Sequence, residues 1–118
     1  MKKRLLVVIS ILMISAVLTA CGGGTKPDGM TQEVYEIGCN ALEIMEKYNN
    51  AEIDKENAES RISALYTKIS NVPELSDVIE NANKGFVESS IFLFKMSLDS
   101  NDGGTYDQEK SLRELLKK

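Results

Sequence analysis

The chain has 118 residues, with 14 basic and 18 acidic side chains, a formal net charge of −4 and a hydrophobic content of 42%. It has no histidine, which excludes Ser-His and Cys-His nucleophile pairs and most zinc or iron sites, and it has neither a Gly-x-Ser-x-Gly nor a Walker-type motif. We therefore expect no enzyme, no catalytic residues, no metal ligands and no cofactor.

The first 20 residues have the composition of an export signal. Three cationic residues at positions 2 to 4 precede an apolar run that starts at Leu5 and ends at Ala20. That run is 16 residues long, shorter than the ~20 residues with which a helix crosses the hydrocarbon core. The pattern predicts a cleaved signal peptide over residues 1–20, with an uncleaved anchor helix as the alternative. Either interpretation places the rest of the chain outside the cytoplasm.

The end of the signal carries a specific motif, Leu18-Thr19-Ala20-Cys21. It resembles the lipobox of bacterial lipoprotein precursors. The resemblance implies that the signal peptidase recognises Leu18, Thr19 and Ala20, and that Cys21 receives diacylglycerol and becomes the acylated first residue. It also implies a lipid anchor, with acyl chains such as palmitate, on the extracytoplasmic face of the cell membrane. Two acyl chains, at ~0.8 kcal/mol per buried methylene, anchor a protein stably.

A polar, glycine-rich segment follows the motif. We expect residues 21–30 to be the lipid attachment site and a flexible tether, and residues 31–118 to be one helical domain. Removal of the signal leaves 11 basic and 18 acidic side chains, a net charge near −7, which argues against binding to nucleic acid. Cys39 is then the one remaining thiol, and we expect it to act as a small hydrophobic residue at the edge of the core.

The apolar spacing predicts two helices that pair as an antiparallel hairpin. The first begins at the N-cap Thr31 and ends at Asn49-Asn50, with Gly38 inside its apolar face, where it allows a close helix approach. The second begins at the N-cap Asp54. The stretches 41–48 and 53–66 resemble small uncharacterised helical proteins of Firmicutes, from which no function transfers.

A third helix is expected from Pro73, which suits the first turn because it lacks an N–H. One apolar stripe on it joins Leu75, Val78, Ile79, Ala82 and Phe86, with Leu93 and Met96 near the same line. The other side of the same helix carries Val87, Ile91, Phe94 and Leu98.

A helix that is apolar all round is either buried on every side or leaves an apolar patch exposed. The four residues Val87, Ile91, Phe94 and Leu98 are therefore a candidate interaction surface, with core packing as the alternative. A strand over residues 91–96 is a second alternative, and Gly85 could mark a break in the helix.

The loop from Asp99 to Thr105 invites comparison with a calcium-binding EF-hand loop. Gly103 and Lys110 stand where that loop needs a side-chain oxygen and a bidentate glutamate, so the sequence predicts a turn, with weak calcium binding as the alternative. A last helix is expected from Thr105, with Gln108 completing a capping box.

These observations predict an all-α domain, a small four-helix bundle after a signal peptide and tether. We expect an accessory or protein-interaction lipoprotein of the cell envelope, which contacts the membrane through the lipid on Cys21 and binds an envelope protein or itself. A lipoprotein that binds a small ligand or ion is the alternative. An exposed apolar patch would favour the first function, and a concave site with converging polar groups would favour the second.

Overall fold

The computed structural model describes residues 26–100 and 103–118. The predicted signal peptide and the motif Leu18-Thr19-Ala20-Cys21 lie outside the described residues. Within them the protein is all-α, with four helices: α2 (Gln32–Asn49), α3 (Lys55–Ser70), α4 (Val78–Ser97) and α5 (Gly104–Leu116). The predicted small four-helix bundle is confirmed. Among these described helices none combines the length and the apolar character that a membrane crossing requires.

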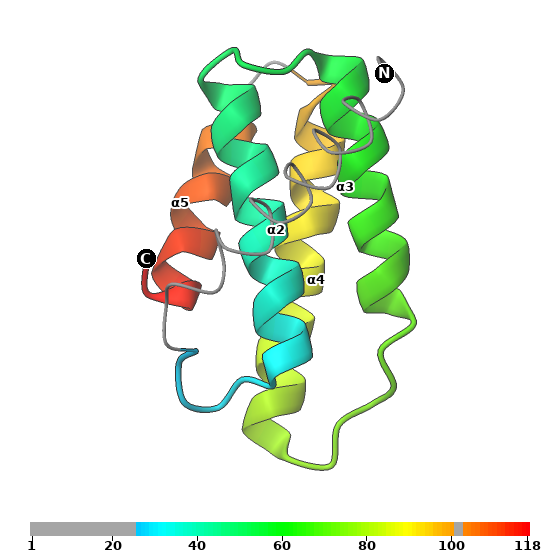
Figure 1. Cartoon of the computed structure of the whole chain (residues 1–118), viewed down its shortest axis with the longest axis vertical. Helices are drawn as coiled ribbons and strands as arrows, with labels where there is room; N and C mark the ends of the chain where they lie inside the picture. Colours follow the sequence, from blue (N-terminus) through cyan, green and yellow to red (C-terminus); the bar gives the residue numbers. More distant parts are fainter. Residues whose placement is uncertain (1–25, 101–102) are drawn as a thin grey trace, which may run out of the picture.

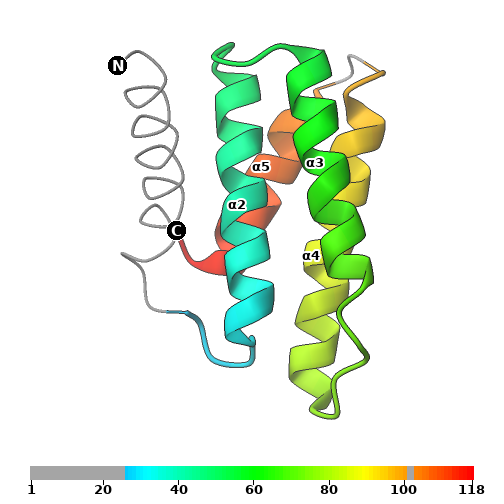
Figure 2. The same cartoon turned by 45° about the vertical axis from the view of Figure 1, so that its right-hand side comes forward.

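The helices alternate in direction along the chain, so each is antiparallel to the next (Figure 1). α2 and α3 form one layer, with α4 and α5 behind them, as the turned view in Figure 2 also shows. α2 packs against α3 and α5 and reaches α4 across the bundle, while α4 packs against both α3 and α5. The predicted antiparallel hairpin of the first two helices is confirmed.

Three of the helices begin at a side chain that caps their first turn. Thr31, Asp54 and Asp77 each accept a hydrogen bond from the backbone N–H three residues later, at 3.3, 2.8 and 2.9 Å. α5 instead follows Gly103, whose φ of 84° suits glycine, and it has no side-chain cap. The expected capping box at Thr105 is therefore wrong, because Thr105 lies inside the helix and is buried.

The start of α4 also differs from the prediction. Pro73 lies in the connection before the helix, which begins at Val78. The Asp77 carboxylate caps the helix, and the Asn81 side chain accepts a hydrogen bond from the Leu75 N–H at 3.0 Å, which ties the connection to the first turn. The cap at Asp77 and the hydrogen bond between Leu75 and Asn81 determine where α4 begins more strongly than the φ preference of proline does. α4 then continues through Gly85, and residues 91–96 are helical, so the alternative strand does not form.

The core lies between the four helices and takes its largest share from α2. Its buried apolar residues are Met30, Val34, Tyr35, Ile37, Cys39, Ala41, Leu42, Ile44, Met45, Ala58, Ile62, Ile69, Val72, Val87, Ile91, Phe94, Leu98, Leu112 and Leu116. Because α2 touches all three other helices, its buried arc is wide.

The domain begins before Thr31. Met30 is 1% exposed and belongs to the core, and the backbone carbonyl of Gly29 accepts a hydrogen bond from the Asn83 side chain of α4. The predicted boundary between tether and domain at residue 31 is therefore too late. The reason is that Gly29, with φ of 80°, turns the chain so that Met30 reaches the core.

Polar contacts join the end of α2 to α5. The Asn49 side-chain amide donates to the Thr105 carbonyl at 3.1 Å and to the Glu109 carboxylate at 2.9 Å. Arg113 donates to Glu109 at 3.1 Å and to Glu46 at 2.7 Å, and the hydrogen bond to Glu109 contributes most to raising the pKa of Arg113. These bonds fix the position of α5 along α2.

Gly38 allows α5 to approach α2 closely, as the sequence predicts. A Cβ atom added at Gly38 would lie 3.0 Å from a methyl group of Leu116. Close packing of two helices through a glycine is a common use of that residue inside an apolar face.

We expect Gly38→Leu to lower the free energy of unfolding by about 1–3 kcal/mol, because the larger side chain overlaps Leu116. The control is Gly85→Leu, since a Cβ atom at Gly85 meets nothing within 4 Å. Urea unfolding at low micromolar protein concentration, followed by circular dichroism, measures both. Equal stability of the two variants would contradict the close packing at Gly38.

Candidate interaction surface

The four residues predicted as an interaction surface lie in the core. Val87, Ile91 and Phe94 are fully buried and Leu98 is 2% exposed. The Phe94 ring meets the Tyr48 ring of α2 edge to face, with centroids 5.9 Å apart. The surface assignment is therefore wrong for these residues, and the core alternative is correct. The physical reason is that this side of α4 faces the three other helices.

The opposite side of α4 is exposed instead, and it is apolar. Six large side chains on it have exposed fractions between 43% and 83%: Val78, Ile79, Phe86, Phe92, Leu93 and Met96. Most of them belong to the stripe that the sequence analysis places on the other side from Phe94. At 100° per residue these positions share one side of the helix, together with the exposed Ala82, Gly85 and Ser89. We call these nine residues the outer face of α4.

The outer face carries no charged side chain over the whole length from Val78 to Met96. The charged residues of α4 lie elsewhere around the helix and are half-buried: Glu80, Lys84, Glu88 and Lys95. Single exposed apolar residues are common on protein surfaces, but a contiguous apolar patch along a helix marks an interaction site. The outer face is therefore the strongest candidate site among the described residues.

One edge of the outer face is supported by α3. The rings of Phe92 and Tyr66 have centroids 5.9 Å apart and are tilted by 40°. A shallow hollow between the two helices is lined by Tyr66, Gly85, Glu88, Ser89 and Phe92. This aromatic contact places Phe92 against α3 at the edge of the outer face.

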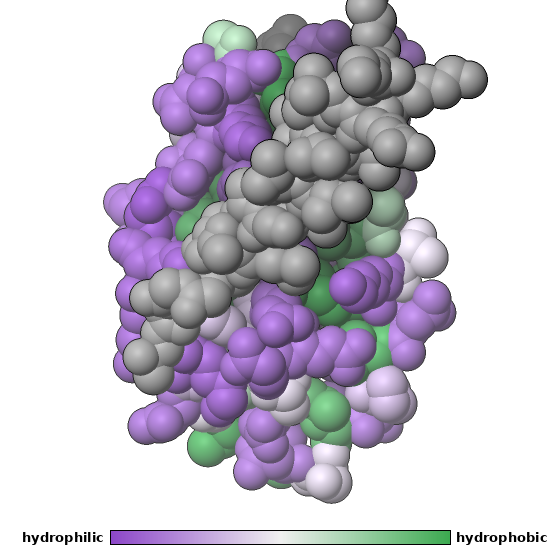
Figure 3. Space-filling view, viewed as in Figure 1, coloured by the Kyte–Doolittle hydropathy of each residue, from purple (hydrophilic) through white to green (hydrophobic). Residues whose placement is uncertain are grey.

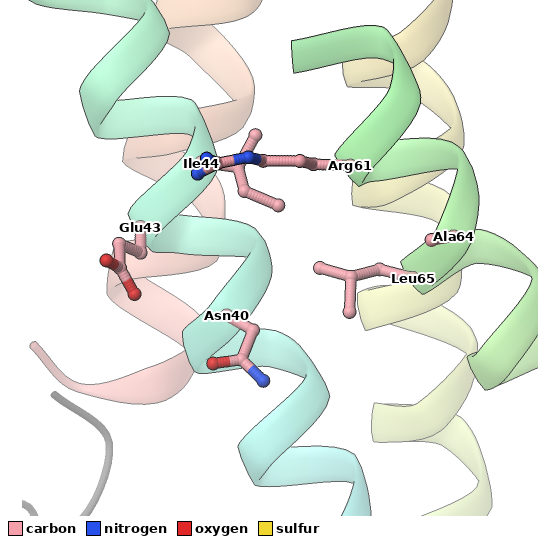
Figure 4. A pocket seen from close by; sticks show the side chains of 6 residues that line it. All are labelled: Asn40, Glu43, Ile44, Arg61, Ala64 and Leu65. Carbon is pink, nitrogen blue, oxygen red and sulfur yellow. The ribbon is translucent and has the colours of Figure 1, made fainter. Parts of the chain in front are cut away.

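A second candidate is a groove between α2 and α3, with a volume of about 330 Å³. It is lined by Asn40, Glu43, Ile44, Arg61, Ala64 and Leu65 (Figure 4). Figure 4 shows Arg61 reaching from α3 toward Ile44 on α2, while Glu43 points away. Hydrophobic residues are visible in the seam between these helices among hydrophilic neighbours (Figure 3). The groove is open and mostly apolar, with few polar groups that converge on it.

The loop after α4 offers no clear ion site in its described part. The Asp99 carboxylate pairs with Lys55 at 2.6 Å, so a cation from α3 already occupies its oxygen. Asn101 and Asp102 lie outside the described residues. Elsewhere in residues 26–100 and 103–118, no three histidine, cysteine or acidic side chains gather as a metal would require.

Cys39 is buried, 6% exposed, and has a free thiol. Its predicted position as a small hydrophobic residue of the core is confirmed.

The two stripes of α4 predicted from the sequence are correct, but the predicted interaction surface is on the wrong one. The absence of charge from the Val78 stripe was visible in the sequence. That signal was weak because the Phe94 stripe also lacks charge.

Comparison of the chain with known protein families, with curated proteins and with solved structures found no match.

The two sides of α4 can be compared with one substitution on each. We expect Phe94→Ala to lower the free energy of unfolding by about 3–5 kcal/mol, because it opens a cavity in the core. Phe86→Ala is the matched control and should change stability by less than about 1 kcal/mol, because 60% of the Phe86 side chain is already exposed. Urea titrations of the two variants test this, and a larger loss at Phe86 would contradict the orientation of α4.

Proposed function

We propose that this chain is the precursor of a bacterial lipoprotein that acts as a protein-interaction module of the cell envelope. Its lipid on Cys21 anchors it to the extracytoplasmic face of the membrane. The motif Leu18-Thr19-Ala20-Cys21 after a short apolar run supports the anchor. The net charge near −7 after cleavage argues against nucleic acid as a partner.

The observation that carries the interaction role is the outer face of α4. An uncharged face with six large exposed apolar side chains is costly to leave in water and marks a contact with another molecule. This chain offers no histidine, and the described residues show no cluster of metal ligands, so binding accounts for the molecule better than catalysis does. The partner we propose is an envelope protein or a second copy of the chain.

A short segment joins the proposed anchor to a residue that contacts α4. Gly29 touches the first half of α4 through Asn83, and it lies eight positions after Cys21. Eight residues span at most about 28 Å when extended. A lipid on Cys21 would therefore keep the outer face near the membrane surface, within reach of other anchored proteins.

A second candidate function is the binding of a small ligand in the groove between α2 and α3. The groove combines the apolar side chains of Ile44 and Leu65 with the guanidinium of Arg61, which suits an apolar ligand that carries an anionic group. The open shape and the few converging polar groups favour the interaction role over this one.

Cys21→Ala tests the anchor. In the bacterium that produces the chain, we expect the native protein to incorporate a labelled palmitate analogue and to remain in the membrane fraction. Cys21→Ala should lose the label because no sulfur is left to acylate, whereas the control Cys39→Ala should keep it. Equal labelling of the Cys21→Ala variant would contradict lipidation, and unprocessed, unlabelled native chain in the membrane would indicate an uncleaved anchor helix.

The interaction role is tested by a photoreactive benzoyl-phenylalanine in place of Phe86 in the full chain. Irradiation of intact cells should give a covalent protein adduct, because Phe86 is 60% exposed and lies midway along the length of the outer face. The same residue in place of Tyr106, which is exposed on α5, is the control and should give little adduct. Absence of a protein adduct at Phe86 would contradict the proposed role.

A further inference from the structure

The outer face of α4 has the spacing of a coiled-coil seam. Six of its residues follow one another at alternating intervals of four and three: Val78, Ala82, Gly85, Ser89, Phe92 and Met96. Intervals of four and three are the heptad pattern by which one helix packs along another over several turns. The described bundle buries the other side of α4, and the seam residues are exposed, with Phe92 touching Tyr66 of α3 at one edge. The occupant it fits is therefore a helix.

We propose that this helix is the α4 of a second copy of the chain, packed antiparallel through the two outer faces. The inference rests on the proposed interaction role and specifies its partner. A twofold pairing of this kind is isologous, so both copies use the same residues and the assembly closes as a dimer.

The sizes of the seam residues match in the antiparallel direction. The twofold axis is placed at the level of residue 87 along both helices. Val78 then lies opposite the partner's Met96, and Ala82 lies opposite the partner's Phe92. Gly85 then faces the partner's Ser89, where two small residues let the helices approach closely. Along the same edge Phe86 lies near the partner's Phe86. A core packs well when large and small residues alternate across facing positions.

The parallel direction matches less well. It would place Phe92 against the partner's Phe92 and Gly85 against the partner's Gly85. Two large side chains would then meet about two turns from two glycines, and the helix separation that suits one contact would not suit the other. A straight pair of helices cannot pack both contacts at native density. The size pattern therefore favours the antiparallel pair.

The exposed area suits a dimer. From the exposed fractions of the six large side chains, the outer face presents on the order of 600 Å² of apolar side-chain surface, taking about 150–250 Å² for a large side chain. Stable interfaces bury about 800 Å² per partner, and the backbone and side chains at the edge add to the apolar area. The dimer would be of small to standard size.

Charge permits a second copy at this face. Two chains that each carry a net charge near −7 repel one another overall, and the outer face adds no acidic side chain to that repulsion. The nearest acidic side chain, Glu88, lies at the α3 edge of the outer face and accepts a hydrogen bond from the Ser70 hydroxyl at 3.5 Å. The twofold axis that brings the two Phe86 side chains together also brings the two Glu88 side chains near one another on the opposite edge, and this like-charge contact opposes association. A membrane surface would instead select basic residues beside the apolar face, whereas α4 carries two basic and two acidic side chains.

Paired cysteines in the full, membrane-anchored chain test the inference. Val78→Cys together with Met96→Cys should give a covalent dimer on mild oxidation of the membranes, because the two thiols meet across the pair. Each single variant should give at least tenfold less dimer. In an antiparallel pair two copies of position 78 lie about 27 Å apart, since 18 residues separate it from position 96 at 1.5 Å per residue. The same distance prevents a bond within one chain, and Tyr106→Cys controls for random collision.

The outcomes separate this inference from the proposed function. Equal dimer from a single variant would indicate a parallel or random contact, and no dimer from the double variant would indicate no such pair, so either result overturns the antiparallel dimer. A Phe86 photo-adduct with a different protein, together with no dimer, would overturn the second copy and leave the interaction role standing. A Phe86 adduct with lipid alone would overturn both.

Discussion

The burial of one side of α4 against the other three helices is the constraint on which the rest of this structure depends. Val87, Ile91 and Phe94 are fully buried, and the Phe94 ring is held against Tyr48. Once this side is fixed in the core, the rotation of α4 about its own axis is fixed too, and the opposite side must face outward. The exposed apolar face is therefore a direct consequence of how the core is packed.

Much of the fold is readable from the sequence, because α2 and α3 have a clear apolar period and a capping residue at their start. Thr31 and Asp54 are the N-caps in the structure, and Gly38 is the point of close contact with Leu116. The start of α4 was not readable, since Pro73 and Asp77 both suit a helix start. The helix begins after Asp77 because the Asp77 carboxylate caps it and the Asn81 side chain accepts a hydrogen bond from the Leu75 N–H.

The candidate site could be predicted only in part. Periodicity groups the residues of α4 into two stripes, but it does not say which stripe the neighbouring helices cover. Both stripes are apolar, so burial follows from contacts far apart in sequence, such as Tyr48 with Phe94. Small residues distinguish the stripes after the fact, because Ala82, Gly85 and Ser89 fill little space and so contribute less to a core than Ile91 or Phe94 do.

The anchor and the outer face strengthen one another in the proposed assembly. A helix pair that buries an area near the lower end of stable interfaces associates weakly in free solution, because association must offset the loss of translational and rotational freedom. Two chains held on one membrane have already lost much of that freedom, and confinement raises their effective concentration. Gly29 lies against Ile79 and Asn83 in the first half of α4, so in an antiparallel pair the two Gly29 residues lie toward opposite halves of the paired helices. Lipids on the two Cys21 residues would reach the bilayer most directly with the pair lying along the membrane surface, since each connection spans at most about 28 Å. The proposed anchor is therefore compatible with the pairing of the two outer faces.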